Sequence, residues 1–254
     1  MTARRRFYTS VAVTEDLGIV LDGRSVKTPM RAPLRLPTPA LAEAVAAEWS
    51  GQGAEINPAT MIMTKLANTA IDRVGPDRAR IEAEVLDFAG SDLVCYRADR
   101  PPDLVQRQRS QWDPVIDWAR TALDAPFEVT EGIVHKPQRK EAIAACALAL
   151  KDLNDFELAA FHSIMSLTGS ALIAMMLARN ATVPEAAWLA AHADEDYQIQ
   201  HWGQDAEAQA KRAARYTEFM ACCRFMALAR TTGISVARQP PTPTPPHEGE
   251  GNHN

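Results

Sequence analysis

One predicted helix near the C-terminus places a carboxylate among apolar residues. The stretch 192–203 reads HADEDYQIQHWG, and the helix that contains it is predicted to begin at Pro184. With 3.6 residues per turn, Glu195 shares one stripe with four apolar side chains, which are Trp188, Ala191, Ile199 and Trp202. A carboxylate in such surroundings costs free energy unless a partner compensates it. Glu195 is therefore the leading candidate for a functional residue, with Asp194 and Asp196 to either side of the stripe.

Two interpretations of Glu195 are open from the sequence. In the structural interpretation, an arginine from a neighbouring helix pairs with the carboxylate, since structural ion pairs also produce buried acids. In the functional interpretation, Glu195 belongs to a binding or catalytic site. A Glu195→Gln variant distinguishes the two, because a loss of stability alone would argue against the functional role.

The residues around Glu195 do not form a recognisable catalytic or metal site. His192 and His201 lie on nearby turns, but His201 is rotated off the stripe, so one helix cannot aim all three side chains at one ion. The phosphate-binding, nucleophile-elbow and zinc-protease motifs are missing from the sequence. Binding is therefore favoured over catalysis, with a metal- or carboxylate-dependent hydrolase using the Glu195 region as the alternative.

Composition and charge indicate a globular protein with two differently built parts. The chain has 254 residues, of which 46% are hydrophobic, and a formal net charge of −5. Residues 1–36 carry seven Lys/Arg and three Asp/Glu, a net charge of +4, so the remainder carries −9. This basic start is too small and dispersed for a nucleic-acid footprint, and no nucleic-acid partner is expected.

Cysteine use and hydropathy favour a reducing compartment without membrane insertion. None of the four cysteines forms a C-x-x-C pair, and the first residues lack the apolar core of a secretory signal. The 21 residues 158–178 carry no Asp, Glu, Lys or Arg and are long enough to span a bilayer. They contain His162, serines and a glycine and lack aromatic anchors at their ends, which favours a buried central helix.

Patterning predicts an α+β fold that is mainly α. Residues 1–36 read as three or four short strands, a small N-terminal sheet or partial barrel with a tight turn at Asp22-Gly23. A larger helical domain follows over 37–232, and a Pro/Gly-rich tail over 233–254 is predicted to be disordered. Helices are expected near 38–50, 59–73, 77–89, 101–123 with a kink or break at Pro114, 138–152, 155–179, 184–202 and 204–230. Residues 92–97 are expected to be extended, and 124–136 to be a connector with a short hairpin.

A series of short motifs resembles a known family. They are, in chain order, Arg6-Phe7-Tyr8, Leu21-Asp22-Gly23-Arg24, Val26-Lys27-Thr28-Pro29, Leu36-Pro37-Thr38, Glu48-Trp49 with Gln52, Ile56 with Pro58 and Met61, Leu66-Ala67-Asn68-Thr69-Ala70-Ile71-Asp72, Asp92-Leu93 through Tyr96-Arg97, Trp112-Asp113-Pro114, and Glu195-x-x-Gln198-x-x-x-Trp202-Gly203. Their number, order and spacing over residues 6–228 resemble the ATP synthase assembly chaperones that attend the α subunit of the catalytic sector, mitochondrial F1 complex assembly factor 2 and its bacterial relatives. The sequence departs from the family pattern at Ile62, where a proline is expected directly after Met61.

The resemblance implies a chaperone rather than an enzyme. It implies transient binding of the free α subunit, cover for an apolar surface of that subunit, and replacement by β during assembly. The family's important glutamate matches Glu195, and the expected client-binding set is Asp194, Glu195, Asp196, Gln198 and Trp202. No cofactor or metal is expected. A monomer is expected, in the cytoplasm of a bacterium or the mitochondrial matrix of a eukaryote.

Overall fold

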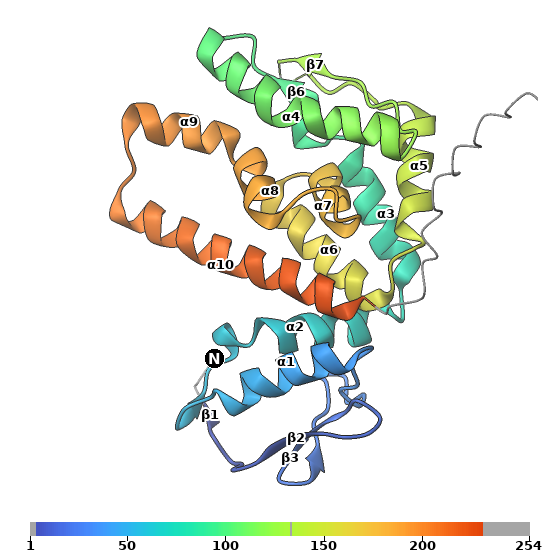
Figure 1. Ribbon diagram of the computed structural model, residues 1–254, viewed down its shortest axis with the longest axis vertical. Coiled ribbons are helices and arrows are strands. Elements are labelled where there is room, and N and C mark those ends of the chain that lie inside the picture. The colour runs from blue at the N-terminus through green and yellow to red at the C-terminus, as the bar shows by residue number, and fades with distance from the viewer. Residues whose placement is uncertain (1–3, 133, 231–254) are drawn as a thin grey trace, which may run out of the picture.

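A small β-containing part lies against a larger body of helices (Figure 1). The computed structural model describes residues 4–132 and 134–230, so the predicted tail over 233–254 lies outside the described residues. Four short strands precede the first helix, and helices dominate the rest of the described chain, which confirms the predicted α+β, mainly α fold class. The exact division into parts at residue 36 stays a prediction.

The N-terminal strands form an antiparallel meander. Strands β2 (Val11–Val13), β3 (Ile19–Leu21) and β4 (Arg24–Ser25) pair in that order. Asp22 and Gly23 connect β3 to β4 with φ angles of 46° and 76°, which confirms the predicted tight turn. The Asp22 carboxylate accepts hydrogen bonds from the backbone N–H groups of Ser10 and Thr9, which lowers the pKa of Asp22 to about 2.

Two further strand pairs join distant segments. Strand β1 (Arg4–Arg5) pairs with β5 (Glu55–Ile56), and β6 (Tyr96–Arg97) pairs with β7 (Thr130–Glu131). The second pair is parallel, so the hairpin predicted within 124–136 is wrong. Here β7 takes its partner from residues about thirty positions earlier in the chain, which local patterning cannot reveal.

The helices follow the predicted order with shorter segments at several places. They are α1 (Pro39–Ser50), α2 (Ile62–Thr69), α3 (Arg78–Ala89), α4 (Pro102–Ala122), α5 (Lys140–Leu150), α6 (Asp155–Thr168), α7 (Ala171–Ala178), α8 (Pro184–Ala191), α9 (Ala193–Trp202) and α10 (Ala206–Ala229). The predicted helix 59–73 is instead a 3₁₀ turn (Pro58–Thr60), α2 and a π-helical turn (Ala70–Val74). Helix α4 passes through Pro114 unbroken, so a break at that residue is wrong.

The single helix predicted over 155–179 is wrong, because the chain turns at Gly169 between α6 and α7. Gly169 adopts a left-handed φ of 71°, and the Ser170 hydroxyl caps α7 by accepting the Ile173 N–H at 3.0 Å. Asp92, fully buried, accepts the Leu172 N–H at 3.0 Å and the Val94 N–H at 3.2 Å. The Asp92 carboxylate therefore caps the N-terminal ends of both α7 and a 3₁₀ turn (Leu93–Cys95) inside the core.

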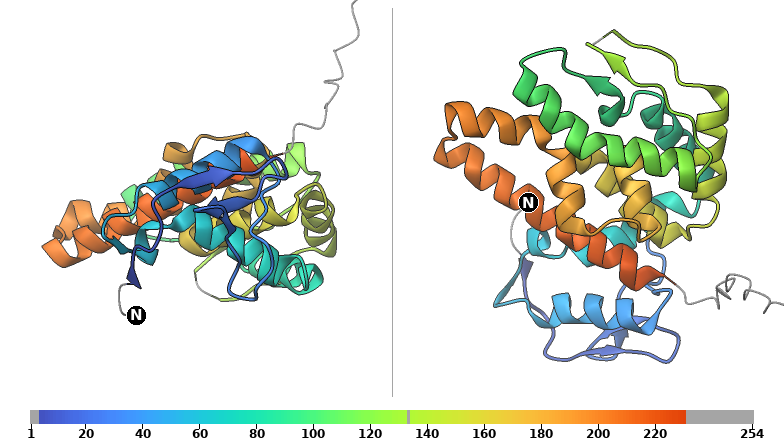
Figure 2. Two further views of the ribbon diagram at one scale, coloured as in Figure 1. Left: turned by 90° about the horizontal axis from the view of Figure 1, so that it is seen from below. Right: turned by 45° about the horizontal axis from the view of Figure 1, so that its top comes forward.

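The charge-free segment 158–178 is the centre of the helical body. Helices α6 and α7 lie inside a ring formed by α3, α4, α8 and α10 (Figures 1 and 2). Most of their side chains are buried, including Phe161, Ile164 and Leu172. The predicted burial of this segment is confirmed, and no helix within the described ranges has the length and hydropathy needed to cross a membrane.

The N-terminal part is joined to the helices by shared packing and specific hydrogen bonds. Ile19 and Leu34 belong to the same apolar cluster as residues of α6 and α10. The Thr38 hydroxyl donates to the Leu228 carbonyl of α10 at 2.5 Å. The Glu48 carboxylate accepts the backbone N–H groups of Met63 and Thr64, at 2.7 and 2.8 Å. These contacts hold α1 and α2 against the helical body.

The buried carboxylate of Asp92 predicts a measurable pH dependence of stability. Burial raises the pKa of Asp92 from about 3.8 to about 6. The unfolded chain ionises this group at lower pH than the folded chain, so the stability that Asp92 contributes is present below pH 4 and is lost as pH rises through 6. Relative to Asp92→Asn, which does not titrate, wild type should lose about 2 to 3 kcal/mol between pH 4 and 7. Urea unfolding across this range measures the difference, and a constant difference would contradict the prediction.

Candidate functional site

The region around Glu195 is built from two helices rather than one. The predicted helix 184–202 is wrong, because α8 ends at Ala191 and α9 begins at Ala193, with His192 between them at φ −114° and ψ 22°. Three acidic residues, 194–196, occupy the first turn of α9, where negative charge favours a helix N-terminus. The acidic run 194–196 is thus a feature of the sequence that indicates the start of a second helix at this point.

The break divides the predicted stripe. Trp188 lies in the core with 6% of its surface exposed, and His192 stacks on it with ring centroids 3.7 Å apart. Trp202, at the far end of α9, has 75% of its surface exposed. Glu195 lies between these extremes, with 32% of its side chain exposed. The prediction of one continuous apolar stripe is therefore wrong.

Glu195 pairs with arginines from the neighbouring helix α10. The Arg215 Nη2 atom lies 2.9 Å from both carboxylate oxygens of Glu195. The Arg212 Nη1 atom lies 3.7 Å from one of these oxygens, and His192 Nε2 lies 3.9 Å from the other. The pairing foreseen in the structural interpretation is therefore present, while a third of the glutamate side chain still faces solvent.

The two flanking acids hold α9 to different neighbours. Asp194 accepts a hydrogen bond from Gln108 Nε2 of α4 at 2.8 Å. Asp196 forms an ion pair with Arg212 of α10. Together with the Glu195 pair, these contacts fix the first turn of α9 between α4 and α10.

Gln198 and Trp202 differ from the three acids. The side chain of Gln198 is exposed and forms no hydrogen bond to another described residue. The Trp202 ring packs edge-to-face with Tyr197 and lies tilted against His201. The five predicted client-binding residues thus fall into two groups. The three acids position the first turn of α9, and Gln198 and Trp202 are exposed farther along the same helix.

The histidines of this region have separate environments. Burial lowers the pKa of His192, whose Nδ1 lies 2.9 Å from the Trp188 carbonyl oxygen. His201 Nε2 lies 3.5 Å from Asp103 of α4. Within residues 4–132 and 134–230, no group of three His, Cys, Asp or Glu side chains is placed to hold a metal ion.

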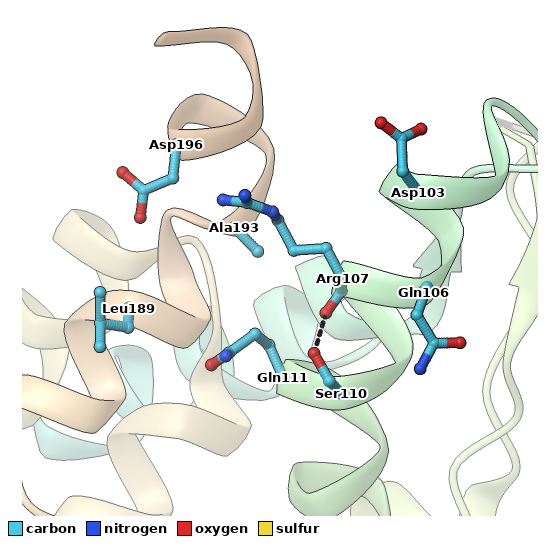
Figure 3. A pocket seen from close by; sticks show the side chains of 8 residues that line it. All are labelled: Asp103, Gln106, Arg107, Ser110, Gln111, Leu189, Ala193 and Asp196. Carbon is cyan, nitrogen blue, oxygen red and sulfur yellow. Dashed lines mark hydrogen bonds between the residues drawn. The ribbon is translucent and has the colours of Figure 1, made fainter. Parts of the chain in front are cut away.

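A polar cleft of about 370 Å³ lies between α4 and the α8–α9 junction (Figure 3). Arg107 extends from α4 toward α9, where it donates to Gln200, and its guanidinium carbon lies 5.9 Å from the centre of the Tyr197 ring. The Ser110 hydroxyl donates to the Arg107 carbonyl at 2.8 Å. This serine is thus engaged within its own helix, and the cleft pairs it with no histidine base.

Helix α9 and the first half of α10, residues 193–217, project from the body as an arm (Figures 1 and 2). Residues 206–217 of α10 contain no buried side chain, whereas residues 219–229 contain six. Arg107 and Gln108 of α4 hold α9 to the body through polar contacts, and Ala193 and Tyr197 of α9 are buried. Within the arm, Arg212 and Arg215 of α10 pair with Asp196 and Glu195 of α9. Sequence patterning missed these arginines because only the folded chain brings α4, α9 and α10 together.

Comparison with known proteins identifies the family. Residues 5–120 match the model of the ATP12 chaperone protein family. The structure is similar to a crystal structure of Atp12 from Paracoccus denitrificans, with a TM-score of 0.83, 38% identity, and coverage of 89% of this chain and 99% of that chain. The chain belongs to the ATP12 chaperone family. ATP12-family proteins are ATP synthase assembly chaperones.

Two further relatives show the range of the family. The crystal structure of the Atu1473 protein of Agrobacterium tumefaciens is similar to this chain with a TM-score of 0.85 and 42% identity. The match covers 90% of this chain and 87% of that chain. The mitochondrial protein atp12 of Schizosaccharomyces pombe is 24% identical over 215 residues, which cover 78% of this chain and 74% of that protein. The resemblance inferred from the short motifs is confirmed.

A double-mutant cycle measures what the Glu195–Arg215 pair contributes to folding. Both side chains are partly exposed, at 32% and 44%, so solvent screens the pair. Glu195→Gln, Arg215→Gln and the double variant should give a coupling free energy of about 0.5 to 1 kcal/mol by urea unfolding. A coupling above about 2 kcal/mol would make the pair a main element of stability and favour the structural interpretation.

Proposed function

We propose that this ATP12-family chain binds the free α subunit of ATP synthase and shields its apolar assembly surface until β replaces the chaperone. The projecting arm carries this proposal. Residues 206–217 of α10 contain no fully buried side chain, and Trp202 is three-quarters exposed at the end of α9. A tryptophan in this position contributes little to the chain's own core, whereas tryptophan is a frequent anchor in protein interfaces.

In this proposal the five predicted residues have two roles. Asp194, Glu195 and Asp196 set the orientation of α9, and the exposed part of Glu195 meets a Lys or Arg of the client. Gln198 and Trp202 contact the client directly from the exposed end of α9. The contacts of Asp194 with Gln108 and of Asp196 with Arg212 support a positioning role for these two acids.

A chaperone that yields to β needs an interface of moderate size. About 1,200–2,000 Å² of total buried surface is the standard size of a specific protein–protein interface, whereas obligate interfaces are larger. Binding energy alone accomplishes shielding and release, so neither nucleotide nor metal is required. We propose that the chain acts as a monomer. Its site of action is the bacterial cytoplasm, or the matrix in a mitochondrial setting.

Co-expression with the α subunit, and separately with β, tests the proposed client. A soluble complex on size-exclusion chromatography is expected with α and none with β. If neither subunit co-elutes, and α aggregates equally with and without the chaperone, the proposal of an α-specific chaperone would be overturned.

A Glu195→Gln variant tests the site. We expect it to reduce the yield of the α complex about tenfold, because it removes the charge that meets the client cation, while the melting temperature changes little. Glu82→Gln is the matched control, since Glu82 is also partly exposed, at 25%, and also pairs with an arginine, Arg78 at 2.7 Å, but lies on α3. Equal yields for wild type and Glu195→Gln would sink the binding role.

The alternative class is a hydrolase that uses the Glu195 region. The Glu195 carboxylate is paired with Arg215. The described residues that line the cleft between α4 and the α8–α9 junction include no nucleophile–base pair. Turnover of generic ester, phosphate and peptide substrates that is abolished by Glu195→Gln would favour the hydrolase. Absence of turnover together with α binding would favour the chaperone.

A further inference from the structure

An apolar groove of about 500 Å³ lies between α8 and the part of α10 that belongs to the arm. Trp188 and Leu189 line it from α8, and Ala213 and Tyr216 line it from α10. Leu189 has 53% of its surface exposed, which is a large apolar side chain left in solvent by the chain's own folding. The groove therefore offers an aromatic floor and an aliphatic edge to an apolar side chain from outside.

The charge around this groove is one-sided. Residues 184–205 contain five Asp or Glu and no Lys or Arg, and residues 206–217 add one acid and three bases, so 184–217 carries a net charge of −3. Each of the three bases already pairs with an acid, in the pairs Lys211–Glu207, Arg212–Asp196 and Arg215–Glu195. The charge of residues 184–217 that is not paired in this way is therefore negative.

Glu185 is the acid left available at the groove. Asp205 caps α10 by accepting the Ala208 N–H, and Asp194 accepts from Gln108. Glu185 is exposed in the first turn of α8 and has no ion pair or side-chain hydrogen bond with any described residue. Arg212 also lines the groove, but Asp196 neutralises its charge. An unpaired carboxylate at the rim of an apolar groove is complementary to an apolar segment that carries a cation.

We infer that the α8–α10 groove docks a client segment in which an apolar side chain stands next to a lysine or arginine, with the apolar group against Trp188, Leu189 and Tyr216 and the cation at Glu185. This inference rests on the proposed function, since the segment is assigned to the α subunit. It adds a contact surface that is separate from the end of α9, where Gln198 and Trp202 lie.

Two adjacent alanines of α10 provide a matched steric test. Ala213 lines the groove, and Ala214 is also exposed on the same helix but does not line the groove. After co-expression with the α subunit, Ala213→Lys should reduce the yield of the complex about tenfold, because the long side chain fills the groove and repels the client cation. Ala214→Lys should stay within about twofold of wild type. Far-UV circular dichroism and melting curves establish that both variants fold.

Two further variants test the charge of the client segment. Ala213→Glu fills the groove to a similar extent but attracts a cation, so it should lose clearly less complex than Ala213→Lys. Glu185→Gln should reduce the yield about threefold at low salt and less at high salt, because the lost contact is electrostatic. Glu141→Gln is its control, since Glu141 is likewise exposed in the first turn of its helix, α5.

The outcomes separate this inference from the proposed function. If wild type forms no complex with α, the proposed function fails. If wild type forms the complex and Ala213→Lys forms it equally well, the groove inference alone is overturned. A greater loss for Ala213→Glu than for Ala213→Lys would overturn the basic character of the client segment, and unequal effects of Ala213→Lys and Ala214→Lys in the expected direction would support the groove.

Discussion

The buried carboxylate of Asp92 is the interaction on which the helical body depends. The charge-free segment 158–178 must change direction inside the core, which leaves the first N–H groups of α7 without helical partners. Asp92 accepts one of these groups and the Ser170 hydroxyl accepts another, so the turn at Gly169 leaves them satisfied. Helices α3, α4, α8 and α10 can then pack around a segment that contains no Asp, Glu, Lys or Arg.

The arm and the helical body are stabilised by different kinds of contact. The body is held by apolar burial. Residues 193–217 meet α4 through hydrogen bonds of Asp194 with Gln108 and of Tyr197 with Asp103, and ion pairs of Arg212 and Arg215 join the two helices of the arm to each other. Partly exposed polar contacts of this kind each contribute little to folding. Trp202 at the end of the arm and Leu189 of the neighbouring α8 are not needed for these contacts and are largely exposed to solvent.

This division suits an assembly chaperone of the ATP12 family. A client surface that must later meet another subunit has to be covered and then released, which favours a compact set of anchors over an extensive interface. An arm that is stable when unoccupied also avoids a large ordering cost on binding. In the proposed arrangement, the client would be held at two places, the exposed end of α9 and the α8–α10 groove.

Local patterning determined much of this protein. The short N-terminal strands, the Asp22-Gly23 turn, the position of most helices and the burial of 158–178 follow from residue types and spacing, because these features depend on neighbours in the chain. The family also followed from motifs distributed along the sequence. The acidic run at 194–196 even carried the signal of the helix break at His192, although the apolar periodicity across it concealed the break.

The tertiary structure alone decided which groups meet. Whether Glu195 was paired could not be read from its own helix, because Arg212 and Arg215 stand on the next one and only packing sets their distance from it. The parallel pairing of β6 with β7, the reach of Asp92 to the start of α7 and the groove between α8 and α10 likewise join residues far apart in the chain. Sequence fixes the periodicity of each element, but the rotation of one element against another depends on the packing of the whole core.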